Sequence, residues 1–117
     1  MKPSLRVSVL SALKGVRHVL STQRNARIHT IIGLFVMGLG LLLGLTRVEM
    51  SIVLLVIALV IVTEIINTAL EIFADAVHPR VGTQVERFKD ASAASVLIAS
   101  LIALLIGALI FIPHLLG

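Results

Sequence analysis

The feature that most constrains this chain is a set of polar side chains inside a segment apolar enough to cross a membrane. Residues 51–73 are mostly hydrocarbon, yet the segment contains Glu64, Asn67 and Glu71, and Asp75 follows at its exit. On a helix, Glu71 and Asp75 point within about 20° of Glu64, and Asn67 lies about 60° away. We call these four side chains the acidic row. Because a carboxylate in hydrocarbon is costly, the acidic row indicates a functional site.

A structural explanation is that these acids form ion pairs within a helix bundle. The sequence disfavours this explanation, because no Lys or Arg occurs between Glu49 and Arg80 and the acids therefore lack a local partner. The opposite face of the same helix has only apolar side chains: Leu55, Val62, Ile66 and Phe73.

Composition places the chain among integral membrane proteins. Of its 117 residues, 58% are hydrophobic and 14% are charged, whereas a soluble domain has about a quarter charged residues. We therefore expect one membrane domain over residues 1–117. There is no cysteine, which excludes disulfides and Cys-type zinc sites.

The net charge of +4 comes largely from an N-terminal basic arm. Six basic residues and no acid precede the first long apolar run: Lys2, Arg6, Lys14, Arg17, Arg24 and Arg27. Such an arm suits anionic lipid headgroups at the cytoplasmic membrane surface. No aromatic residue is interleaved for base stacking, so nucleic acid is not an expected partner.

The pattern predicts an all-α membrane protein with three transmembrane helices and an N-terminal amphipathic surface helix. The surface helix is expected over about residues 4–20, and the spans over about 28–45, 51–73 and 91–112. A signal peptide is excluded, because Lys14 and Arg17 interrupt its apolar core.

The links between the spans set the expected topology. The first link, Thr46–Met50, is short, whereas the second, over about 76–89, carries Arg80, Arg87 and Lys89. The positive-inside rule then places the basic arm, the N-terminus and the second link in the cytoplasm.

This topology gathers the acidic row with Lys89 and Asp90 at the cytoplasmic interface. Phosphoryl transfer needs such a set: oxygen ligands for Mg²⁺, a cation for phosphate, and a carboxylate near the attacking hydroxyl. A proton or ion transporter remains an alternative, but the outer halves of the spans lack the polar residues of a relay. No Walker-type glycine loop is present.

The sequence resembles the prokaryotic diacylglycerol kinase family, which includes undecaprenol kinases. The resemblance extends from residue 12 to residue 113 and is most specific in two stretches: Glu64-Ile-Ile-Asn67-Thr-Ala-Leu-Glu71-Ile-Phe-Ala-Asp75 and Lys89-Asp90-Ala-Ser-Ala-Ala-Ser-Val. It implies a homotrimer with active sites between subunits, in the prokaryotic inner membrane. It also implies Mg²⁺-dependent transfer of phosphate from ATP to a membrane lipid alcohol.

The resemblance also implies roles for individual residues. Glu64 is expected to be the catalytic base, and Glu71 a metal ligand. Contacts with ATP are expected from three side chains: Glu71, Lys89 and Asp90. Two further side chains are expected to support the site: Asn67 and Asp75.

Two positions depart from the family pattern. Gln23 stands where relatives usually have a Glu that is a second metal ligand, so its neutral oxygen should bind Mg²⁺ more weakly. An inactive member acting as a membrane scaffold is therefore an alternative. In the second link, Arg80-Val81-Gly82 replaces the usual Glu and His near the nucleotide. His78 is a nearby substitute for that histidine in one interpretation, but the favoured interpretation is a loop histidine without such a role.

The lipid alcohol is left open by the sequence, between diacylglycerol and undecaprenol. Arg24-Asn25 and Ile28-His29 are more similar to the undecaprenol kinase branch.

Overall fold

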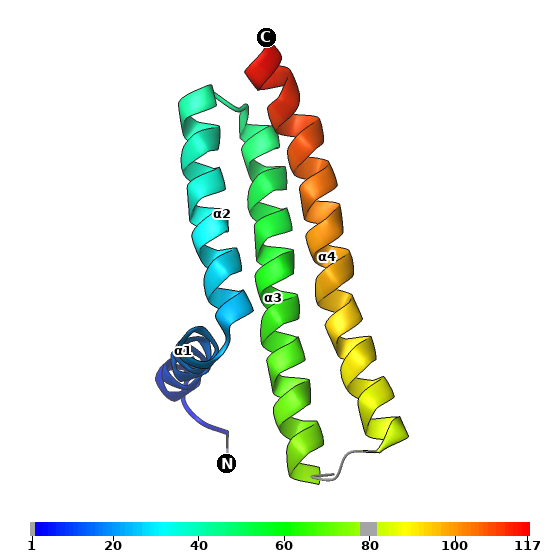
Figure 1. The fold of residues 1–117 in the computed structure, drawn as a ribbon. Helices are drawn as coiled ribbons and strands as arrows, with labels where there is room; N and C mark the ends of the chain where they lie inside the picture. The colour runs from blue at the N-terminus through cyan, green and yellow to red at the C-terminus, as the bar shows by residue number, and fades with distance from the viewer. Residues whose placement is uncertain (1, 78–81) are drawn as a thin grey trace.

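The computed structural model describes residues 2–77 and 82–117, and the regular structure in these ranges is helical throughout. The four helices are α1 (Leu5–Thr22), α2 (Arg24–Leu43), α3 (Arg47–Val77) and α4 (Thr83–Leu116). α2, α3 and α4 lie side by side, and α1 turns away from them at the lower end of α2 (Figure 1). Three of the helices, α2, α3 and α4, are long and apolar enough to cross a membrane. The expected all-α class with three spans and a surface helix is confirmed.

α1 begins at a side-chain cap and remains largely uncovered. The Ser4 Oγ accepts a hydrogen bond from the Val7 N–H over 3.3 Å, which satisfies one of the free N–H groups of the first turn. Val19 is the only buried residue of α1, while Leu5 and Leu13 are exposed. An exposed apolar face on a basic helix is typical of a helix that lies on a lipid surface.

α3 begins within the expected link Thr46–Met50, at Arg47. The Glu49 N–H donates to Thr46 Oγ1 over 3.1 Å, and the Thr46 N–H donates to Glu49 Oε1 over 2.9 Å. This reciprocal pair is a capping box, which starts a helix. Gly44 provides the turn, with a left-handed φ of 73° that glycine adopts without steric cost.

α4 likewise begins within the expected second link, at Thr83, and includes all of residues 83–89. Helix-forming Gln84, Glu86 and Arg87 favour this extension. With 31 and 34 residues, α3 and α4 are about 46 and 51 Å long, against about 30 Å of hydrocarbon. Their ends therefore reach beyond the spanning segments 51–73 and 91–112.

The buried residues of α3 form one face toward the other helices. They are Val53, Val60, Glu64, Thr68 and Ala74. Close packing at this face is possible because Gly33 of α2 lacks a side chain: a Cβ there would lie 2.8 Å from Ile57 Cγ2. Most large apolar side chains of the chain point outward, as expected for a surface covered by lipid or by another subunit.

Candidate active site

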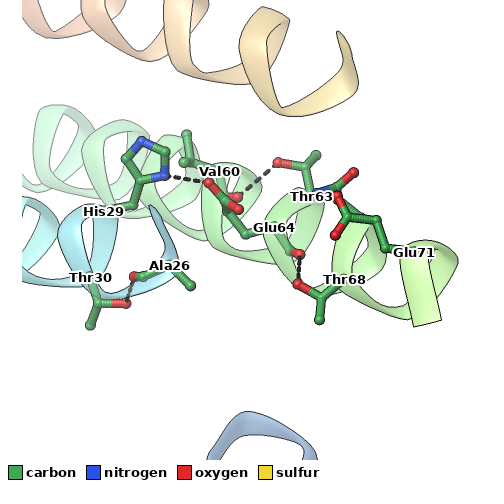
Figure 2. Close-up of polar contacts among 9 residues, drawn as sticks. Ala26, His29, Thr30, Val60, Thr63, Glu64, Thr68 and Glu71 are labelled. Carbon is green, nitrogen blue, oxygen red and sulfur yellow. Dashed lines mark hydrogen bonds and ion pairs between the residues drawn. The ribbon is translucent and has the colours of Figure 1, made fainter. Parts of the chain in front are cut away.

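Glu64 lies on the buried face of α3 and is only 3% exposed. Its Oε1 is 2.7 Å from Nδ1 of His29 in α2, and Figure 2 shows the imidazole turned toward the carboxylate. The contact is at ion-pair distance, but it falls outside hydrogen-bond geometry. Neither atom has a hydrogen-bond partner among the described residues. Among the described residues, His29 is thus the side chain that offsets the cost of burying the Glu64 carboxylate.

The hydroxyl groups around Glu64 are satisfied by their own helices (Figure 2). Thr68 Oγ1 donates to the main-chain oxygen of Glu64 over 2.9 Å, and Thr63 Oγ1 donates to that of Val60 over 2.8 Å. Such bonds to the preceding turn satisfy hydroxyl groups in apolar helices. Because both hydroxyl groups bind main-chain oxygens, no hydroxyl group of the described residues binds the carboxylate of Glu64.

Asn67 connects the next acid of the row to α4. Its Nδ2 donates to Glu71 Oε1 over 3.2 Å, and its Oδ1 accepts a hydrogen bond from Ser92 Oγ over 2.7 Å. Ser92 is buried and Asn67 is half-buried, so this contact is partly shielded from solvent. Both ends of the Asn67 amide are therefore used, and they fix the side chain beside the carboxylate of Glu71.

Lys89 and Asp75 form an ion pair at the same end of the bundle. Lys89 precedes the spanning segment 91–112. The hydrogen bond to the Asp75 carboxylate, followed by the charges of Asp75 and Glu71, raises the pKa of Lys89 above its ordinary value. Lys89 therefore carries a positive charge at neutral pH, and its charge interacts with that of Glu71.

The remaining predicted site residues are less closely joined to this group. Gln23 lies between α1 and α2 and is half-buried, with Nε2 3.5 Å from Thr22 Oγ1. Asp90 is exposed on α4 next to Lys89. His78 and Arg80 lie outside the described residues.

The donor set is compatible with a magnesium nucleotide. Among the described residues, no three His, Asp or Glu side chains converge as a preformed metal site. Mg²⁺ is commonly held by one or two carboxylates together with phosphate oxygens. The half-buried carboxylate of Glu71 has the chemistry of such a ligand, because Asn67 engages its Oε1 and no described hydrogen bond engages its Oε2.

Sequence reasoning missed the contribution of His29. The acids were expected to lack a partner because Lys and Arg are absent from the neighbouring sequence, but the partner of Glu64 comes from α2. An available signal was His29 itself, since an ionisable residue within an expected span is a candidate for function. Ser92 was missed because a serine in an apolar helix has no distinctive pattern.

An apolar groove of about 550 Å³ lies between α2, α3 and α4. Its lining includes Gly33, Val60 and Phe111, and its polar side chains are His29 and Ser100. The Ser100 Oγ is buried and has no hydrogen-bond partner among the described residues. The groove therefore joins an apolar surface to the histidine that contacts Glu64.

Comparison with known proteins assigns the chain to a family. Residues 10–111 match the family described as prokaryotic diacylglycerol kinase. The chain is 36% identical over 116 residues to a protein named diacylglycerol kinase of Synechocystis sp., covering 98% of this chain and 66% of that protein. It is 32% identical over 108 residues to a protein named undecaprenol kinase of Bacillus subtilis, covering 92% of this chain and 88% of that protein. The chain spans just under two thirds of the length of the Synechocystis relative. Because the family match covers most of its own length, the chain belongs to the prokaryotic diacylglycerol kinase family.

Proposed function

We propose that this protein is a lipid kinase that transfers the γ-phosphoryl group of ATP to the hydroxyl of a membrane lipid alcohol. The observation that best supports this function is the arrangement of the acidic row along α3. Glu64 is buried within the apolar segment, whereas Glu71 and Asp75 lie progressively nearer the helix end, where Lys89 joins them. A lipid hydroxyl and a nucleotide from water would meet along such a row.

In this proposal Glu64 is the base that takes the proton of the lipid hydroxyl. The lipid oxygen forms a bond to the γ-phosphorus, the bond from that phosphorus to the bridging oxygen breaks, and ADP leaves. The burial of Glu64 supports this role, because a carboxylate in a water-excluded site is not screened by solvent.

The nucleotide is assigned to the polar end of the row. Glu71 would hold Mg²⁺ with Gln23 as a neutral donor, while Lys89 and Asp90 would contact ATP. When bound, magnesium would neutralise charge on the phosphate groups. The hydrogen bonds of Asn67 and the ion pair of Asp75 would keep Glu71 and Lys89 in place.

The proposed setting is the cytoplasmic face of a prokaryotic inner membrane, with the N-terminus in the cytoplasm and a homotrimer as the functional unit. The basic arm and Lys89 support this orientation through the positive-inside rule. The outward-facing apolar side chains of α2–α4 leave room for contact with other subunits.

The test is a phosphorylation assay of the purified protein with radiolabelled ATP and Mg²⁺ in mixed micelles. Diacylglycerol and undecaprenol are supplied in separate reactions, and Glu64→Gln is the matched control. We expect label in at least one lipid with the native protein and none with the variant. Absence of label in both lipids from a correctly assembled protein would contradict the kinase and favour a membrane scaffold.

A further inference from the structure

His29 of α2 contacts the buried acid of α3, Glu64. Its side chain is 27% exposed, but its Nδ1 is fully buried and lies 2.7 Å from Oε1 of Glu64. The side chain of Glu64 is 4% exposed. The imidazole thus covers the carboxylate on the α2 side (Figure 2).

The contact with His29 offsets the free-energy cost of burying the Glu64 carboxylate, which the side chains of α3 do not offset. A buried carboxylate without a partner is strongly unfavourable, and removing one member of a buried pair leaves the other uncompensated. The polar neighbours of Glu64 on α3, Thr63 and Thr68, direct their hydroxyl groups to main-chain oxygens instead. The position of the carboxylate therefore depends on the ring of His29.

The ring also lines the apolar groove between α2, α3 and α4. The ring of His29 therefore borders the groove and also contacts the Glu64 carboxylate. Its Nδ1 contacts Oε1 of Glu64, whereas no described hydrogen bond engages the second oxygen, Oε2. The lining of the groove includes His29 but not Glu64, and Oε2 is the carboxylate oxygen that His29 leaves free.

We propose that His29 is a positioning residue of the phosphoryl transfer: it holds Oε1 of Glu64 and thereby directs Oε2 toward the acceptor hydroxyl. This inference rests on the proposed kinase function. In this role the ring contacts Oε1 through Nδ1, and it acts on the lipid through Glu64 without entering the bonds that form and break.

The test uses two substitutions that differ in one property. His29→Leu removes the polar contact, whereas His29→Asn keeps a donor near the position of Nδ1. Since misplacing a catalytic group by about 1 Å can cost about 100-fold in rate, we expect kcat of His29→Leu to fall about 100-fold. The KM for ATP should stay within about twofold of the native value, because the nucleotide lies at the other end of the row. His29→Asn should recover a large part of the rate.

A matched control is His18→Leu, which changes an exposed histidine on α1 and should leave both constants unchanged. All forms are first compared by size-exclusion chromatography in detergent. Should His29→Leu fail to assemble, an assembled His29→Asn with native KM for ATP and most of the native kcat still supports the role.

Two results would overturn the proposal for His29 alone: a native kcat in His29→Leu, or an assembled His29→Asn as slow as the leucine variant. A native protein that labels neither diacylglycerol nor undecaprenol would instead overturn the kinase function, and the inference with it. Activity of the native protein therefore separates the two failures.

Discussion

Ser92 of α4 donates a hydrogen bond to Oδ1 of Asn67 in α3 over 2.7 Å. Because the other end of the same amide donates to Glu71, the packing of α4 against α3 is connected to the orientation of a proposed metal ligand. The acidic row is thus held by contacts from both neighbouring helices, with His29 of α2 on Glu64 and Ser92 of α4 on Asn67.

Ser92→Ala should weaken both the fold and the proposed metal site. The substitution leaves a half-buried amide oxygen without its partner, which costs about 1–3 kcal/mol. We expect a lower melting temperature and a higher Mg²⁺ concentration for half-maximal activity. Ser95→Ala is the control, because Ser95 Oγ donates only to the main-chain oxygen of Ser92 over 2.6 Å. Equal effects of the two substitutions would show that Asn67 does not depend on Ser92.

Glu64→Gln should abolish lipid phosphorylation while ATP binding and oligomer size stay close to native. The amide is nearly isosteric but cannot take a proton from the lipid hydroxyl. Turnover, nucleotide binding and size-exclusion profiles are measured on the same preparation. Near-native turnover would remove Glu64 from the mechanism.

Glu71→Ala and Asp75→Ala separate a kinase from a scaffold. In the kinase, these changes remove a metal ligand and the partner of Lys89, so activity should be lost and the assembly preserved. In a scaffold that uses the acidic row for helix packing, the same changes should dissociate the oligomer. Activity and mass, the latter from light scattering in detergent, are recorded for each variant.

Gln23→Glu should lower the Mg²⁺ requirement. Hard cations bind more strongly as the ligands gain negative charge, so the added carboxylate would strengthen a site that Glu71 holds with a neutral donor. We expect a lower midpoint in a Mg²⁺ titration of activity, or the appearance of activity if the native protein is silent. An unchanged midpoint would mean that residue 23 does not face the metal.

Glu49→Gln should destabilise the protein in a pH-dependent way. Glu49, which precedes the spanning segment 51–73, has a lowered pKa because the Thr46 N–H and His114 both bind its carboxylate. His114 Nε2 lies 3.1 Å from both carboxylate oxygens and connects the start of α3 to the end of α4. A lowered folded pKa contributes stability above the ordinary value of 4.5, and this contribution is lost as the pH falls through the lowered value.

Melting temperatures of the native and Glu49→Gln proteins are therefore compared at pH 7 and at decreasing pH. The native protein should melt higher at pH 7, and the difference should shrink below about pH 4. A difference that does not vary with pH would mean that the charge of Glu49 contributes nothing to this contact.

Several properties of the protein follow from the sequence alone. Three long apolar runs must cross a membrane as helices, because main-chain groups in hydrocarbon have to be satisfied internally. The spacing of Glu64, Asn67 and Glu71 places them along one side of a helix whatever the helix packs against. The capping box of Thr46 and Glu49 was also readable, since Thr-x-x-Glu before an apolar run is its signature.

The partners of those side chains were decided only by the tertiary structure. Asn67 meets Ser92 across 25 positions of sequence, and Asp75 meets Lys89 across 14. His29 reaches Glu64 from a different helix. Helical periodicity fixes the angle of a side chain about its own axis, but not the rotation and crossing of one helix relative to another. That rotation is set by the packing of side chains between helices, so the same acidic row could have faced lipid, and here it faces His29 and Ser92.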